Sequence, residues 1–208
     1  MSDAPEESDI PPEQIAFVPR DLLSEHGWLP HGFRADPDQR IYASMCASVD
    51  FSPRPSLETD ESRKQLIPYV VLFSDEGIFT LRRRRAQSES RLHDKLSIGV
   101  GGHVQQAEQR TDLDVLRAGM RRELHEELHI PESVDVDYCG VLNDDSNDVG
   151  RVHYGVVFRC EADPSQVDVR EVEKMVGEWW SVDELEAEKD RLESWSRLLL
   201  PAVKTGRV

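Results

Sequence analysis

The stretch RRELHEELHI, residues 121–130, places three glutamates, two arginines and two histidines around three large aliphatic side chains. The whole chain holds 41 aspartates and glutamates, and acidic runs usually form the solvated face of a helix. Whether these glutamates are ordinary surface or part of a site depends on where a helix would place them.

Residues 112–130 have the apolar spacing of an amphipathic helix. Asp112 or Asp114 stands near its expected start, and Pro131 follows its expected end. Apolar side chains recur at every fourth position and form one ridge that would face a core: Leu116, Met120, Leu124 and Leu128.

The three glutamates lie on one side of this predicted helix. At about 100° per residue, Glu123, Glu126 and Glu127 fall within a sector of roughly 100° beside the apolar ridge. Like charges that close repel one another, and only Arg122, four residues before Glu126, offers compensation. Mg²⁺ or Mn²⁺ would remove the repulsion, because both ions prefer carboxylate oxygens. A solvated acidic face and a metal site both stay open on the spacing alone.

Two glycines, Gly101 and Gly102, close the apolar segment at residues 96–102. Glycines at a strand end let the backbone approach a ligand or phosphate closely, although a bulge or tight turn gives the same pattern. Among the seven histidines, His103 is singled out because it follows these glycines, and a loop or packing role is favoured for it. A glycine-ended strand, a loop and an acidic helix in succession favour a phosphate or metal site.

The remaining pattern predicts a mixed sheet covered by helices on its faces. A β-hairpin is expected where β-branched and aromatic runs flank Asp75-Glu76-Gly77. Asp183 is expected to cap a final helix over residues 184–203. Further strands are expected in four apolar segments, with a polar turn between the second and the third: residues 96–104, 134–144, 151–162 and 178–182.

Residues 122–130 resemble the signature of the Nudix hydrolases, R-E-U-x-E-E-x-G-U, in which U is bulky and apolar. They match it at every specified place except the glycine, which is His129 here. The family glycine caps the helix in a left-handed conformation, which histidine can take at some cost, so the departure concerns the helix end and not the metal site. The family has an acidic residue eight positions before the arginine, where this chain has Asp114. Its glycine lies fourteen positions before the arginine, whereas Gly102 lies twenty positions before Arg122, so the loop is six residues longer.

The resemblance extends over about residues 66–190, because EWWSVDEL is similar to the strand and helix start that close many Nudix domains. The chain looks closest to a little-characterised subgroup of predicted phosphoesterases. The implied fold is α/β, a Nudix-type α/β/α sandwich with a mixed β-sheet between helices. The implied activity is hydrolysis of a diphosphate linkage in a nucleoside diphosphate derivative or a similar small phosphorylated metabolite.

The resemblance also assigns roles to residues of the motif. Mg²⁺ or Mn²⁺ would be held by three carboxylates and one backbone carbonyl: Glu123, Glu126, Glu127 and Gly102. Arg122 would orient the carboxylates through charge-assisted hydrogen bonds. Gly101 and Gly102 would form the backbone part of the cofactor site.

Two other functions stay open. A Nudix-fold binding or sensor module recognises a nucleotide without cleaving it, but such modules commonly lose the motif glutamates that this chain keeps. An enzyme resembling isopentenyl-diphosphate isomerase would need an active cysteine in its own motif, and Cys46 in ASMCASVD does not resemble that motif. A metal-dependent hydrolase is favoured, judged from the site and not from the fold.

Length and composition predict one domain with extensions. A chain of 208 residues with 38% hydrophobic content is long enough for one sizeable core and short for two. Residues 1–14 have the composition of a disordered acidic tail. Residues 15–65, interrupted by prolines, are expected to form an N-terminal extension packed on the main domain, either an irregular layer or substrate-contacting loops. Residues 66–208 are expected to form the Nudix hydrolase domain.

Charge and cysteine content exclude several classes of partner. The net charge of −16 would repel nucleic acid polymers and anionic membranes. Three distant cysteines without a C-x-x-C pair argue against a disulfide framework and a structural zinc site. The first residues have neither the basic nor the apolar region of a signal peptide, and no apolar stretch approaches the length of a membrane span. We expect a cytoplasmic protein with a small anionic phosphorylated substrate, and a homodimer stays open.

Overall fold

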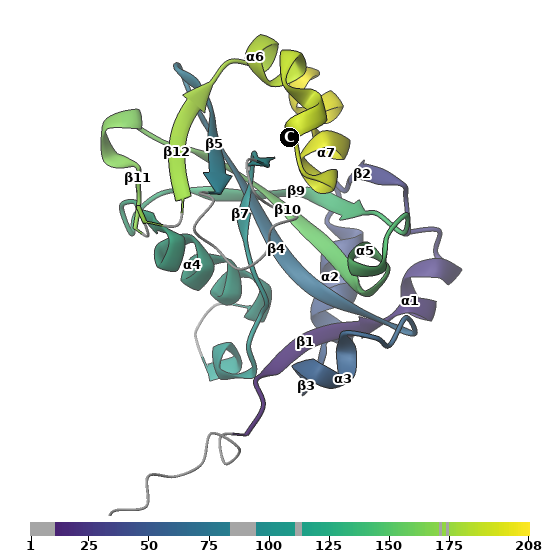
Figure 1. The fold of residues 1–208 in the computed structure, drawn as a ribbon. Helices are drawn as coiled ribbons and strands as arrows, with labels where there is room; N and C mark the ends of the chain where they lie inside the picture. Colours follow the sequence, from purple (N-terminus) through teal and green to yellow (C-terminus); the bar gives the residue numbers. More distant parts are fainter. Residues whose placement is uncertain (1–10, 84–94, 111–113, 171, 174) are drawn as a thin grey trace, which may run out of the picture.

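The structure is a computed structural model that describes residues 11–83, 95–110, 114–170, 172–173 and 175–208. Its described elements form a central sheet with helices on both sides (Figure 1). In chain order they are β1 (Gln14–Pro19), α1 (Arg20–Glu25), β2 (Gly32–Ala35), α2 (Arg40–Ser48), β3 (Asp50–Pro53), α3 (Arg54–Leu57), β4 (Arg63–Ser74), β5 (Gly77–Arg83), β6 (Leu96–Ser97), β7 (Val100–Gly101), η3 (Gln106–Arg110), α4 (Val115–Glu127), β8 (Leu128–His129), β9 (Val136–Asn143), α5 (Asp148–Val152), β10 (His153–Glu161), η4 (Pro164–Gln166), β11 (Asp168–Val169), β12 (Met175–Trp180), α6 (Val182–Ala187), η5 (Lys189–Arg191) and α7 (Ser194–Lys204).

The central sheet is mixed, as the sequence predicts. Its strands follow the order β12-β5-β4-β10-β9-β2, with β1, β3, β6 and β7 attached beside this path. Strands β4 and β10 pair in parallel, whereas β5 joins β4 and β12 by antiparallel pairing. The predicted hairpin around Gly77 is confirmed as β4 and β5.

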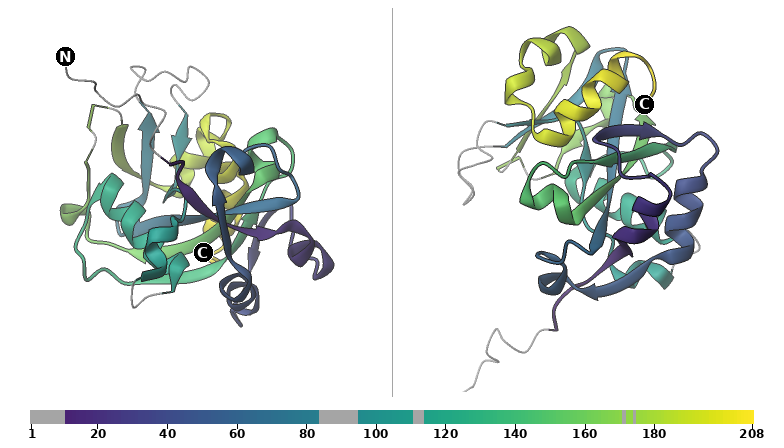
Figure 2. Two further views of the ribbon diagram at one scale, coloured as in Figure 1. Left: turned by 90° about the horizontal axis from the view of Figure 1, so that it is seen from below. Right: turned by 90° about the vertical axis from the view of Figure 1, so that its right-hand side faces the viewer.

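Helices cover both faces of the sheet, which confirms the α/β/α sandwich. Apolar residues of α2 and α4 share one core with the sheet, and those of α6 and α7 share a second core with its other face. In the right-hand view of Figure 2 the yellow α7 and the blue-purple α2 lie on opposite sides of the strands. The apolar ridge of α4 faces the first of these cores, so the glutamates lie on the part of the helix beside this buried ridge.

The N-terminal extension is more regular than its prolines suggested. Strand β1 pairs with β4 and β3, and β2 pairs with β9 at the edge of the sheet. Ile15 and Val18 are fully buried, so β1 contributes to the core. The expectation of an irregular layer is wrong for this segment, whose prolines lie largely at strand ends and in turns. The predicted tail falls mostly on residues 1–10, which lie outside the described residues.

Four local predictions also need correction. The strand expected at residues 96–104 is two short strands, β6 and β7, and the polar turn before β10 contains the helix α5. The expected final helix is divided into α6 and α7. Ser181 caps α6 instead of Asp183, because its hydroxyl accepts from the Glu184 amide while the Glu184 carboxylate accepts from the Ser181 amide.

Within the part of the chain that the structure describes, no helix is long and apolar enough to cross a membrane.

Candidate functional site

Helix α4 carries the motif and begins and ends close to the predicted positions. Asp114 caps its start, accepting a hydrogen bond from the Arg117 amide at 3.0 Å. After Glu127 the chain passes directly into the extended strand β8, in which His129 pairs with Asp168 of β11. His129 does not take the left-handed conformation of the family glycine, since a chain that leaves a helix straight into a strand needs no left-handed cap.

The apolar ridge of α4 packs against the sheet beside the glycines. All four predicted ridge residues are buried, and α4 contacts β4 and β7. Strand β7 ends at Gly101 and contacts α4, and the next residue, Gly102, lies against Glu123 of that helix. Residues twenty positions apart in sequence are therefore brought together, as a site requires.

Arg122 binds several acceptors around the site. Its Nε donates to Glu108 Oε1 at 2.5 Å. Its Nη1 donates to Glu123 Oε1 and Glu126 Oε2, both at 2.8 Å, and its Nη2 donates to the His103 carbonyl at 2.6 Å. The guanidinium thus draws two motif carboxylates together and ties them to the loop after the glycines.

Glu123 lies directly against Gly102. A Cβ atom on Gly102 would stand 2.3 Å from the carboxyl carbon of Glu123, a distance that only glycine avoids. The Glu123 side chain is 14% exposed, and burial raises the pKa of its carboxyl group while the neighbouring Arg122 opposes that rise. The close approach expected of this glycine is therefore made to a carboxylate of the motif.

The other two glutamates occupy the last turn of α4. The Glu126 side chain is 59% exposed and contacts Arg122, and Glu127 is half-buried, with its backbone carbonyl accepting from the Arg170 amide. Convergence of all three carboxylates on one cleft stays a prediction.

The donor atoms suit a hard divalent cation, although they do not surround one point. Carboxylate and backbone oxygens are the ligands that Mg²⁺ and Mn²⁺ prefer. The contact between Glu123 and Gly102 places a carboxylate beside the peptide of the expected carbonyl ligand. Among the described residues, no three His, Cys, Asp or Glu side chains are gathered as metal ligands. Binding of one ion by several motif carboxylates therefore requires their side chains to rotate.

Glu108 is the residue that the sequence analysis missed. Its side chain is 8% exposed and pairs with Arg122, whereas the acidic position counted from the arginine is that of Asp114. Asp114 instead caps α4 and accepts from the Tyr42 hydroxyl at 2.7 Å. Counting from the glycine would have found it: the family acid follows the glycine by six positions, and Glu108 follows Gly102 by six. The additional residues therefore lie after Glu108, and residues 111–113 are outside the described residues.

This reassignment leads to a prediction. Glu108→Gln is expected to lower the free energy of unfolding by about 1–3 kcal/mol, because it weakens a buried charged hydrogen bond to Arg122. Asp114→Asn is the matched control, since asparagine caps a helix as well as aspartate does. Urea unfolding of both variants checks this, and a larger loss for Asp114→Asn would contradict the reassignment.

His103 is partly buried beside the site. Burial lowers the pKa of its imidazole to about 3, and the positive charges of Arg54 and Arg122 and the His153 ring act in the same direction. The ring contacts Gln65 and His153. These contacts agree with the packing role that the sequence favours.

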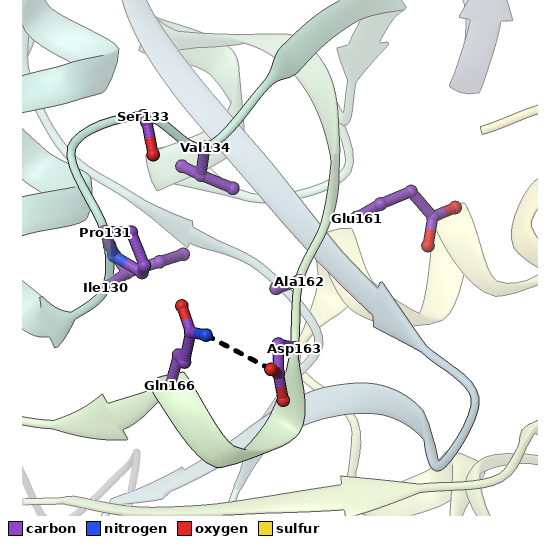
Figure 3. A pocket seen from close by; sticks show the side chains of 8 residues that line it. All are labelled: Ile130, Pro131, Ser133, Val134, Glu161, Ala162, Asp163 and Gln166. Carbon is purple, nitrogen blue, oxygen red and sulfur yellow. Dashed lines mark hydrogen bonds between the residues drawn. The ribbon is translucent and has the colours of Figure 1, made fainter.

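A separate pocket lies beyond the end of α4 (Figure 3). Within it, the Gln166 amide donates to Asp163 at 3.2 Å. Its lining includes none of the motif glutamates and consists of Ile130, Pro131, Ser133, Val134, Glu161, Ala162, Asp163 and Gln166. It is therefore distinct from the site around Arg122.

The family model of the NUDIX domain matches residues 63–203. The chain belongs to the Nudix family. Protein YmaB of Bacillus subtilis (strain 168) is 36% identical over 198 residues, which cover 90% of this chain and 96% of YmaB. The motif that resembles the Nudix signature thus stands in a Nudix domain.

Solved structures agree with this membership. The crystal structure of Tm1382, which is assigned to the Nudix hydrolases, matches this chain with a TM-score of 0.79 and 25% identity. The match covers 93% of this chain and 99% of Tm1382. The NUDIX domain of Shewanella oneidensis NrtR, crystallised with ADP ribose, matches with a TM-score of 0.51 and 15% identity, covering 70% and 89%. The second likeness shows the fold alone.

Proposed function

We propose that this protein is a metal-dependent Nudix hydrolase that cleaves a diphosphate linkage in a nucleoside diphosphate derivative or a similar small phosphorylated metabolite. The observation that carries the proposal is the Arg122 arrangement, in which one guanidinium holds Glu123 and Glu126 while Glu123 rests against Gly102. Family membership supplies the class of reaction, and this arrangement supplies the groups for it.

Each residue has a distinct task in the proposed reaction. Glu123, Glu126, Glu127 and the Gly102 carbonyl would hold Mg²⁺ or Mn²⁺. Bound there, the ion would neutralise phosphate oxygens and lower the pKa of a water molecule. Arg122 keeps two of the carboxylates together by charge-assisted hydrogen bonds from its Nη1, and Glu108 accepts a further hydrogen bond from the Nε of Arg122.

The proposed partner is a small anionic molecule. A surface with net charge −16 repels extended polyanions, whereas a bound divalent cation attracts a diphosphate locally. The NUDIX domain of NrtR binds ADP ribose, a diphosphate of this kind, which makes nucleoside diphosphate sugars a first group to test. The rival function is a binding or sensor module, and it predicts binding of such a molecule without cleavage.

One panel tests the proposal. Nucleoside diphosphate sugars, dinucleoside polyphosphates, nucleoside triphosphates and prenyl diphosphates are incubated with the protein and Mg²⁺, with product release followed with and without an added phosphatase. We expect metal-dependent cleavage of at least one diphosphate compound. Binding without cleavage across the panel would favour the sensor module, and rearrangement of a prenyl diphosphate would favour the isomerase.

A further inference from the structure

Two elements, α4 and β1, hold the backbone of the two residues that follow Gly102. The His103 carbonyl accepts from Arg122 Nη2 of α4 at 2.6 Å. The carbonyl of the next residue, Val104, accepts from the Ala16 amide of β1 at 2.8 Å. The N-terminal extension therefore holds the loop that leaves the candidate site.

The His103 ring is anchored to the central sheet in a defined tautomer. Gln65 Nε2 donates to the Leu57 carbonyl at 3.1 Å, which turns the Gln65 Oε1 toward His103. That oxygen lies 2.8 Å from His103 Nε2 and can only accept, so His103 Nε2 carries the hydrogen. The ring thus donates to a residue of β4.

His153 provides a second acceptor for the same hydrogen. Its Nδ1 lies 2.7 Å from the Val149 carbonyl and must carry a proton, which leaves its Nε2 as an acceptor 3.3 Å from His103 Nε2. His153 is itself fixed, because its backbone carbonyl accepts from the fully buried Lys64 and its position pairs with Gln65 across β10 and β4. Both partners of His103 are therefore rigid parts of the sheet.

We propose that His103 is a positioning residue for the metal site. Through Gln65 and His153 it fixes the Gly102 peptide, whose carbonyl is the proposed ligand, and the His103 carbonyl that binds Arg122. This inference rests on the proposed function. Groups that orient metal ligands from outside commonly change metal affinity or activity by about 10–100-fold when altered. A segment with two glycines needs such an anchor, because glycine restricts the backbone least.

The test separates the hydrogen bond from simple packing. The glutamine side-chain nitrogen reaches the place of a histidine Nε2, whereas that of asparagine reaches only the place of Nδ1. We expect His103→Asn and His153→Asn to weaken Mn²⁺ binding on the order of tenfold. His103→Gln should bind Mn²⁺ nearly as tightly as the unchanged protein. Mn²⁺ affinity is measured without substrate, from the electron paramagnetic resonance signal of the free ion, and circular dichroism checks the fold.

His26→Asn is the matched control. His26 Nδ1 lies 2.9 Å from the Leu22 carbonyl, the same four-residue contact that His153 makes with Val149, and Mn²⁺ affinity should not change. The positioning role would be overturned if the folded asparagine variants bound Mn²⁺ normally, or if His103→Gln bound Mn²⁺ as weakly as His103→Asn. Either result would leave the proposed function standing. If His103→Asn does not fold, His153→Asn decides. An unchanged protein that neither binds Mn²⁺ nor cleaves any compound of the panel would overturn the proposed function itself.

Discussion

Glu127→Gln is expected to lower the rate of diphosphate hydrolysis on the order of a hundredfold or more, because it removes a charged group that the reaction requires. Glutamine has the same shape but no charge, so Mg²⁺ and Mn²⁺ should also bind more weakly. The free energy of unfolding should stay unchanged or rise by a few tenths of a kcal/mol, because repulsion from Glu123, four residues earlier on α4, is relieved. Steady-state kinetics, Mn²⁺ titration and circular dichroism measure the three quantities.

A nearby acid serves as the control for this variant. Glu132 stands beyond α4 with a side chain that is 90% exposed and contacts His125, so Glu132→Gln changes the net charge by the same amount without altering Arg122 or the motif glutamates. Its activity and metal affinity should equal those of the unchanged protein. Near-normal turnover of a well-folded Glu127→Gln protein would refute the assignment and return the acidic cluster to an ordinary helix face.

The parts of the fold that the sequence predicts are those encoded locally. The four-residue spacing from Leu116 to Leu128 predicted both the helix and its buried face, because every ridge residue is a neighbour of the next along the helix. The hairpin around Gly77 was predictable for the same reason, since turn and strands are adjacent in sequence. Helix α4 carries the motif and packs on β4, which is one strand of this hairpin.

Features that depend on distant partners were not predictable. Strand β1 is a short segment between prolines, and it becomes a strand by pairing with β4, more than forty residues later. The acid that pairs with Arg122 can be counted from the glycine or from the arginine, and the longer loop makes the two counts differ, so the sequence alone does not choose between them. Spacing from the arginine indicated Asp114, whereas folding brings Glu108 to the guanidinium. The motif thus predicted the family, while the contacts that support the candidate site required the structure.

The two neighbouring glycines are expected to respond to alanine in opposite ways. A Cβ atom on Gly101 would lie 2.0 Å from the Pro68 carbonyl oxygen, in the backbone of the central strand β4. That oxygen cannot withdraw without disturbing the pairing of Tyr69 with Gly101, so Gly101→Ala should destabilise the fold by about 1–3 kcal/mol or more. Thermal unfolding measures this loss.

Gly102→Ala meets the end of a flexible side chain instead of backbone. The new methyl group would lie 2.3 Å from the carboxyl carbon of Glu123, which can rotate away, so the melting temperature should fall less than in Gly101→Ala. The displaced carboxylate then no longer occupies its place beside the Gly102 carbonyl. Because misplacement by about 1 Å can cost a hundredfold in rate, we expect hydrolysis to fall on that order and Mn²⁺ affinity to fall with it. The contrary result is a Gly102→Ala protein that unfolds as readily as Gly101→Ala but keeps its activity per folded molecule. It would show that Gly102 serves packing. It would also show that the reaction does not need Glu123 beside Gly102.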